Sequence, residues 1–290
     1  MKIRELLKQA VQILVQNGIE DSTIKARTLM QYVLKKEKSY LIINSEEEIK
    51  HEVEMQYNQL VQELIQGKPL QYITNVAEFM GLKFYVNENV LIPQPDTEIL
   101  VEEGIKEIKQ IRKTKPEQTI RILDLCTGSG AIIIAIAKHF EMLADNNIQY
   151  YAIDISTEAI KIAKKNAIFN EVKINFILSD MFQNIKEAGK EKFDMIVSNP
   201  PYIETDIIKK LPKEVQAEPH LALDGGKDGL NFYRIIAKES KQYLKVKGKI
   251  LTEIGYNQKD TVTNIFQKEY KQIECTKDLE NNNRMMKCHS

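Results

Sequence analysis

The chain has 290 residues, 43% hydrophobic and 28% charged, which excludes a mainly disordered protein and allows about two domains. Lysine plus arginine and aspartate plus glutamate each number 41, and this zero net charge argues against non-specific binding to nucleic-acid backbones. Three cysteines without a C-x-x-C spacing, a charged N-terminus without an apolar core, and no apolar run long enough to cross a membrane predict a cytoplasmic protein.

The first 70 residues predict helices only. Apolar side chains recur at helical spacing in three stretches, which we place at about 6–15, 22–34 and 46–66. No catalytic combination of side chains occurs among them. We therefore predict that residues 1–70 form a small helical bundle.

Residues 71–95 differ in composition from the helices before them. β-branched and aromatic residues become frequent, and Gly81 supplies a turn. Pro93 and Pro95 end the stretch, because proline cannot donate to a strand ladder. We predict a β-hairpin linker here, followed by a helix over about 97–111.

From residue 120 onward, apolar strands alternate with amphipathic helices. This order predicts an α/β fold over residues 96–290, with an open, mostly parallel, doubly wound sheet covered by helices. The predicted strands are 120–125, 148–153, 174–178, 193–197, 249–254, 272–277 and 285–289. The predicted helices are 130–140, 157–169, 228–244 and 258–268.

A glycine loop joins the first of these strands to its helix. Gly128 and Gly130 let the backbone approach a ligand closely, and the helix that follows presents free N–H groups. Asp154 ends the next strand, where an acid can bind two ribose hydroxyls, and Asp180 ends the third, where it can receive an adenine amino group. With Asp124, these acids favour a cationic nucleoside, and S-adenosylmethionine fits better than the pyrophosphate of NAD.

The tetrapeptide Asn199-Pro200-Pro201-Tyr202 directly follows another predicted strand. Pro200 restricts Asn199 to an extended conformation, so the loop is stiff. The side-chain oxygen of Asn199 and the backbone carbonyl of Pro200 are two acceptors that can hold a planar –NH2 group, on which Tyr202 can stack. An amide nitrogen held in this way can receive a methyl group by positioning alone, because a sulfonium carries a good leaving group.

The segments DLCTGSGAI and SNPPYI, with Asp154 between them, resemble class I S-adenosylmethionine-dependent methyltransferases that methylate amino groups. The chain as a whole resembles the release-factor glutamine methyltransferase family. Three further stretches carry this resemblance: 71–102, 218–230 and 277–286.

The resemblance implies that S-adenosylmethionine methylates the side-chain amide nitrogen (N5) of the glutamine in the Gly-Gly-Gln motif of peptide-chain release factors. It also implies that the N-terminal helices help to dock the release factor. Implied cofactor contacts are Cys126, Thr127, Gly128, Ser129, Gly130, Asp154 at the ribose, Asp180 and Met181 at the adenine, and Asn199. The substrate glutamine would be held by Asn199, Pro200, Pro201 and Tyr202, with Asn199, Pro200 and Tyr202 as the catalytic residues.

The sequence departs from the family at a few positions. Glycine is usual where this chain has Cys126 and Asn75, and also near Asn281. Asparagine is the commonest non-glycine residue at positive φ, so the two asparagine changes should be mild. The family usually has arginine at the position of Gln94.

Three other functions remain open. A glutamine methyltransferase of a ribosomal protein would share the Asn-Pro-Pro-Tyr loop. A nucleic-acid adenine or guanine amino-methyltransferase is disfavoured by the zero net charge and by the lack of an obvious target-recognition domain. A non-catalytic S-adenosylmethionine-binding protein is suggested by Gln94 and Cys126. The four histidines show no metal spacing, so we expect no metal site. From the zero net charge and the short apolar runs we expect no direct nucleic-acid partner and no membrane contact.

Overall fold

The computed structural model describes residues 1–186, 188–278 and 280–290. Leu279, in one of the stretches that carry the family resemblance, therefore lies outside the described residues. The chain divides into two compact units, Met1–Asn75 with Pro212–Ala217, and Val76–Leu211 with Glu218–Ser290. Among the described residues, no helix combines the length and the apolar character needed to span a membrane.

The first unit is helical, as predicted. Tyr57 is buried at its centre and donates a hydrogen bond from its hydroxyl to the carbonyl of Ala26, at 3.0 Å. A stripe of Leu6, Ala10 and Leu14 packs into the same core, because side chains four residues apart share one helix face. The helices are α1 (Ile3–Gln16), α2 (Ser22–Leu34), α3 (Lys38–Ile43), α4 (His51–Ile65), α5 (Leu70–Thr74) and the distant α10 (Lys213–Gln216).

The start of the third predicted helix is wrong. Residues 46–50 do not join α4, because they pair with the beginning of the chain: Ile3 N–H donates to the carbonyl of Glu47 at 3.0 Å. The N–H of Ile49 donates to the carbonyl of Met1 at 2.8 Å. A segment whose backbone groups bond outward cannot also form the first turn of a helix.

The hairpin opens the second unit. Strands β1 (Val76–Phe79) and β2 (Leu82–Tyr85) pair antiparallel, and Met80 and Gly81 make the turn with φ of 52° and 70°. Two consecutive residues at positive φ suit the twist of a two-residue hairpin. The predicted linker is longer than this hairpin, since residues 71–74 belong to α5 and no strand occurs over 86–95.

A seven-stranded sheet forms the core of the second unit, in the order β5-β4-β3-β6-β7-β9-β8. All neighbouring pairs from β5 to β7 are parallel, and β9 is antiparallel to both β7 and β8, so the predicted fold class is confirmed. The strands are β3 (Ile120–Leu125), β4 (Ile148–Asp154), β5 (Asn175–Leu178), β6 (Phe193–Ser198), β7 (Leu244–Glu253), β8 (Gln272–Lys277) and β9 (Asn283–His289).

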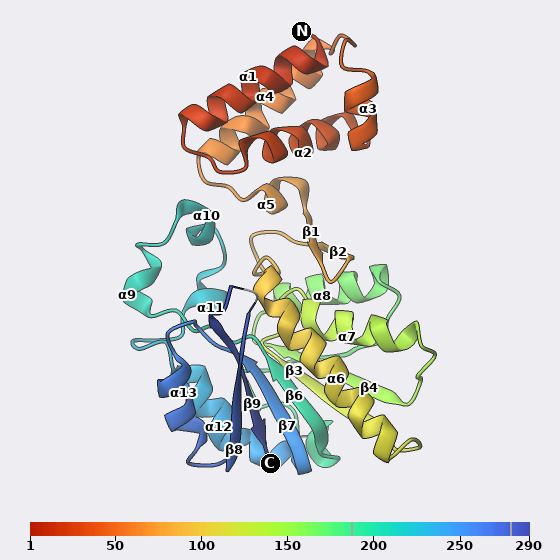
Figure 1. The fold of residues 1–290 in the computed structure, drawn as a ribbon, viewed down its shortest axis with the longest axis vertical. Coiled ribbons are helices and arrows are strands. Elements are labelled where there is room, and N and C mark those ends of the chain that lie inside the picture. The colour runs from red at the N-terminus through yellow and green to blue at the C-terminus, as the bar shows by residue number, and fades with distance from the viewer. Residues whose placement is uncertain (187, 279) are drawn as a thin grey trace. The chain divides into compact units, whose positions relative to one another are not determined.

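Helices cover both faces of this sheet. Every residue of β3 and β6 is buried, which is typical of central parallel strands. Helices α12 and α13 contact β7 to β9, while α7 and α8 contact the strands around β4 (Figure 1). The helical segments are η1 (Pro95–Thr97), α6 (Glu98–Thr114), α7 (Ala131–Glu141), α8 (Thr157–Phe169), η2 (Ala188–Lys190), α9 (Thr205–Ile208), α11 (His220–Leu223), α12 (Asn231–Tyr243) and α13 (Lys259–Phe266).

The parallel strands bring the chemically interesting side chains to one edge. Strands β3 to β7 of the parallel part all end at the same side, so the glycine loop, Asp154, Asp180 and Asn199 meet there. Glu253, the last residue of β7, joins them. Ligands of open α/β sheets bind at this carboxyl edge.

Candidate active site

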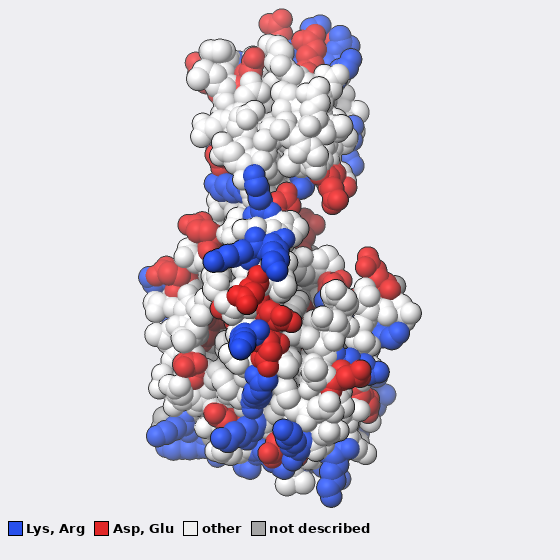
Figure 2. Space-filling model, turned by 90° about the vertical axis from the view of Figure 1, so that its left-hand side faces the viewer, with Lys and Arg blue, Asp and Glu red and all other residues white. Residues whose placement is uncertain are grey.

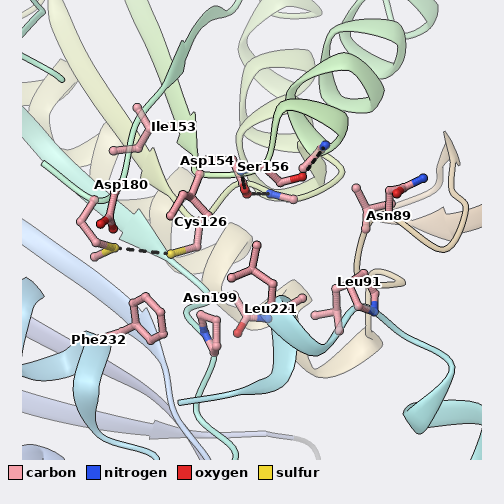
Figure 3. A pocket seen from close by; sticks show the side chains of 18 of the residues that line it. Asn89, Leu91, Cys126, Ile153, Asp154, Ser156, Asp180, Asn199, Leu221 and Phe232 are labelled. Atoms are coloured by element: carbon pink, nitrogen blue, oxygen red, sulfur yellow. Dashed lines mark hydrogen bonds between the residues drawn. The ribbon is translucent and has the colours of Figure 1, made fainter. Parts of the chain in front are cut away.

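A pocket opens at the carboxyl edge of the sheet. It encloses about 990 Å³ of empty space, part of which is open to solvent. Figure 3 shows Asp154 and Asp180 on one side of the pocket, and Asn199 and Phe232 across from them. All four side chains belong to the second unit.

Three residues of the glycine loop adopt a left-handed backbone conformation. Cys126, Gly128 and Gly130 have φ of 57°, 53° and 82°. Cys126 and Gly128 line the pocket. Thr127 instead donates its hydroxyl to Asp124 beneath the loop, at 2.6 Å, and the carbonyl of Ser129 accepts from Asn166 of α8, at 2.9 Å.

Gly130 serves helix packing rather than ligand contact. A Cβ at this position would lie 2.8 Å from Cδ1 of Ile134 and 3.2 Å from Cβ of Ala163. Any larger residue would force Ile134 of α7 and Ala163 of α8 to shift. The five loop residues implied as cofactor contacts therefore divide: Cys126 and Gly128 face the pocket, and the other three support the loop.

Asp154 organises the loop and faces the pocket at the same time. Its Oδ2 accepts from the N–H of Gly128 at 2.8 Å, and its Oδ1 accepts from the N–H of Ser156 at 2.9 Å. Burial raises the pKa of Asp154, and the backbone N–H donors act against that shift. Asp180 also lines the pocket but is exposed, and it accepts a hydrogen bond from Gln183 at 3.0 Å.

Cys126 and Met181 form a sulfur contact on the pocket wall, with 3.7 Å between Sγ and Sδ (Figure 3). Burial raises the pKa of the Cys126 thiol, and the negative charges of Asp154, Asp124 and Asp180 raise it further. The thiol therefore stays protonated and acts as a small apolar group. The φ of Cys126 is positive, a backbone conformation that glycine adopts more readily than cysteine.

The Asn-Pro-Pro-Tyr loop contributes Asn199 and Pro201 to the pocket lining. The side-chain nitrogen of Asn199 donates to Oγ1 of Thr97 at 3.2 Å. Pro200 is buried. Tyr202 packs against the sheet core, and its hydroxyl donates to Oε1 of Glu253 at 3.2 Å, so its ring is not part of the pocket lining.

The sequence reasoning missed several residues around the pocket. Thr97 lies within residues 71–102, one of the stretches that carry the family resemblance. Glu253 is an acid at the end of a strand, the same signal that points to Asp154 and Asp180. The apolar wall of Leu91, Leu221 and Phe232 comes from an irregular segment, from α11 and from α12, and no spacing rule groups such residues in advance.

Glu218 ties two parts of the pocket wall together. Its Oε2 accepts from the N–H of Ile92 at 2.8 Å, next to the lining residues Leu91 and Pro219. Burial raises the pKa of Glu218 to about 7, with the bond from Ile92 acting in the opposite direction. The pairing holds residue 91 and residue 219 at a fixed separation.

Comparison with known families and proteins gives full-length matches. The family descriptions "PrmC N-terminal domain" and "Methyltransferase small domain" match residues 5–74 and 108–227. A release factor glutamine methyltransferase of Clostridium acetobutylicum is 40% identical over 290 residues, covering 99% of this chain and 98% of the relative. One from Bacillus anthracis is 34% identical over 289 residues, with 99% and 98% covered.

Solved structures share the fold. The hMettl16 catalytic domain, in complex with the MAT2A 3'UTR hairpin 6, has a TM-score of 0.52 at 16% identity, covering 77% of this chain and 82% of that one. A T. thermophilus 16S rRNA N2 G1207 methyltransferase, in complex with AdoMet and guanosine, has a TM-score of 0.50 at 14% identity, covering 74% and 49%. At these identities the similarity concerns the fold alone.

Proposed function

The chain belongs to the release factor glutamine methyltransferase family of S-adenosylmethionine-dependent enzymes, and from this premise we propose that it methylates N5 of the glutamine in the Gly-Gly-Gln motif of peptide-chain release factors. One observation carries the proposal. The nitrogen of the Asn199 side chain is engaged by Thr97, so Oδ1 is left as an acceptor at the pocket.

The pocket fits the adenosine end of the cofactor. Asp154 is a half-buried carboxylate at the end of β4, in the position suited to ribose hydroxyls. Met181 and the protonated thiol of Cys126 offer an apolar, polarisable surface, and Asp180 an acceptor, for an adenine ring. The bound cofactor supplies a methyl group on a positively charged sulfur.

The protein's part in the reaction is to hold the substrate amide. An amide nitrogen is a weak nucleophile because its lone pair is shared with the carbonyl. Two acceptors, Oδ1 of Asn199 and the carbonyl of Pro200, hold its two hydrogens in the geometry that leaves the lone pair free for attack. The nitrogen gains the methyl carbon, the sulfur keeps the electrons of the broken bond, and one amide proton leaves to water.

The N-terminal helices fit a docking role. We infer that residues 1–70 help to bind the release factor, that 71–95 serve as the linker, and that 96–290 carry the methyltransferase site. The family description that matches residues 5–74 supports a separate N-terminal domain over this part of the chain. We also place the reaction in the cytoplasm, where release factors meet the ribosome.

The charge distribution supports a protein substrate over a nucleic acid. Acidic and basic side chains are interspersed over the face seen in Figure 2, in keeping with the zero net charge. A chain that follows a phosphate backbone usually gathers its basic residues along one surface.

A side-by-side methylation assay tests the proposed substrate. Purified release factor, ribosomal proteins and ribosomal RNA are each incubated with the chain and S-adenosylmethionine carrying a labelled methyl group. We expect the label in the release factor. Faster labelling of a ribosomal protein or of RNA would replace the proposal with that substrate, and cofactor binding without any labelling would favour a non-catalytic role.

A further inference from the structure

A buried acid lies behind the Asn-Pro-Pro-Tyr loop and connects its two ends. Glu253 is 3% exposed. Its Oε2 accepts from the hydroxyl of Thr97 at 2.5 Å, and its Oε1 accepts from the hydroxyl of Tyr202 at 3.2 Å. Thr97 in turn accepts from the side-chain nitrogen of Asn199, so three hydrogen bonds run from Asn199 through Thr97 and Glu253 to Tyr202.

The direction of these bonds is fixed by the number of protons. A threonine hydroxyl has one proton, and Thr97 gives it to Glu253. Thr97 can then only accept from its other neighbour. Of the two ends of the Asn199 amide, only the nitrogen can donate, so the nitrogen faces Thr97 and the oxygen faces away.

We propose that Glu253 is a positioning residue that acts through Thr97 to keep the oxygen of Asn199, rather than its nitrogen, toward the substrate amide. This inference rests on the proposed function and deepens it. If the Asn199 amide turned by half a turn, its –NH2 group would meet the –NH2 group of the substrate, donor against donor. An asparagine without this support is free to adopt either orientation.

The ionisation state of Glu253 determines which groups donate and which accept in this series of hydrogen bonds. Burial raises the pKa of Glu253 to about 7, while the Thr97 and Tyr202 hydrogen bonds and Arg284 lower it and Asp96 raises it. Tyr233 of α12 donates to the backbone carbonyl of Glu253, at 3.0 Å.

A protonated Glu253 has a proton of its own to donate, and Thr97 or Tyr202 must then accept it. The ionised form accepts on both oxygens. Methyl transfer should therefore increase as the pH rises through about 7.

Three substitutions test the relay, by which we mean the hydrogen bonds that link Asn199, Thr97 and Glu253. Thr97→Val keeps the shape and removes the hydroxyl, and Thr97→Ser keeps the hydroxyl as the matched control. We expect kcat to fall about tenfold to a hundredfold in Thr97→Val and to recover to within about threefold of wild type in Thr97→Ser, with the dissociation constant of S-adenosylmethionine unchanged in both. Glu253→Gln should lose the increase of kcat with pH.

A second readout needs no substrate. The side-chain 15N signals of Asn199 are recorded by NMR in the wild-type chain and in the variants. We expect them to titrate near pH 7 in wild type, to shift in Thr97→Val, and to stop titrating in Glu253→Gln. If the wild-type chain methylates no release factor, the proposed function is wrong. The Asn199 signals would still show whether Glu253 and Thr97 set the orientation of the Asn199 amide. The inference would be overturned by an equal loss of kcat in Thr97→Val and Thr97→Ser. It would also be overturned if the Asn199 signals were unchanged in both Thr97→Val and Glu253→Gln.

Discussion

An asparagine side chain presents its oxygen to a substrate in a fixed orientation when its nitrogen has a hydrogen-bond partner elsewhere. In this protein, Thr97 occupies the nitrogen of Asn199, and the restricted backbone before Pro200 limits how far the side chain can move. The role that we propose for Asn199 is therefore positioning of the substrate amide, with no change in the charge of Asn199 itself.

Asn199→Ala removes that acceptor. We expect kcat for release factor methylation to fall by about two to three orders of magnitude, because the substrate amide loses its alignment. Binding of S-adenosylmethionine, measured by calorimetry, should change less than about threefold, since the residues that we propose to contact the adenosine, Asp154 and Asp180, lie across the pocket from Asn199. A variant that turns over at the wild-type rate would remove Asn199 from the mechanism.

Asp154→Ala should have the reverse effect. Its carboxylate holds the backbone of Gly128 and Ser156 as well as facing the pocket, so the cofactor loses a ribose partner and a fixed loop together. We expect the dissociation constant of S-adenosylmethionine to rise at least about tenfold. Unchanged affinity by calorimetry would count against the ribose assignment.

Backbone conformation at single residues was partly visible in the sequence. Asn75 and Asn281 have φ of 56° and 68°, a left-handed conformation that asparagine adopts more readily than other non-glycine residues. The positive φ of Cys126 was not predicted, because a cysteine gives no local signal for a left-handed backbone. The orientation of Tyr202 was equally hidden, since it depends on Glu253, fifty-one residues later.

At the scale of elements, the contact between α7 and α8 fixes the glycine loop. A Cβ on Gly130 would come within 2.8 Å of Ile134, whereas a Cβ on Gly81 of the hairpin turn would meet nothing within 4 Å. Both residues have positive φ, so the two positions differ only in their surroundings.

This difference gives a matched pair of substitutions. Gly81→Ala should lower the free energy of unfolding by about 1–2 kcal/mol, from the left-handed backbone alone. Gly130→Ala should cost about 1–3 kcal/mol more, because the added methyl also crowds the two helices. Urea unfolding measures both, and equal losses would show that the helix contact does not restrict residue 130.

The bounds of several helices and strands could be predicted accurately from the sequence pattern. The bounds of β3, α8 and β8 agree with their predicted ranges to the residue. The short helices α3 and α5 were missed, since four to six residues carry too little pattern. Strand β7 begins five residues before its predicted start, because α12 ends directly at the strand without a loop.

At the scale of the whole molecule, three buried carboxyl groups resist ionisation. Burial raises the pKa values of Asp124, Glu218 and Glu253 to about 7, above the values of about 4 in an unfolded chain. The folded state therefore holds more protons than the unfolded state between these limits. These groups contribute stability below pH 4, and that contribution is lost as the pH rises to about 7.

Glu253→Gln tests this linkage. The glutamine cannot ionise, so the free energy of unfolding should fall less between pH 5 and pH 8 than it does in wild type. Glu103 provides the opposite case: burial raises its pKa, but Lys287 and Lys106 outweigh that effect and lower it. Glu103→Gln should therefore remove stability that is present above pH 4. If the free energy of unfolding depended on pH in the same way in wild type and in both variants, the pKa shifts assigned to Glu253 and Glu103 would be wrong.

The fold, the family and the edge of the sheet that holds the site could be predicted from the sequence, because they follow from alternating elements and from two short motifs. The contacts that hold the walls of the pocket together could not be predicted in this way. Glu218 and Glu253 act through contacts with residues more than one hundred positions away, at Ile92 and Thr97. Such pairs leave no spacing in a single sequence.

Tandem mass spectrometry of the release factor after reaction with S-adenosylmethionine tests the central claim most directly. The wild-type chain should add about 14 daltons to the glutamine of the Gly-Gly-Gln peptide, with the mass on the side-chain nitrogen, and Asn199→Ala should add it at least about a hundredfold more slowly. Methylation at another residue, or equal modification by both chains, would contradict an active site built on Asn199.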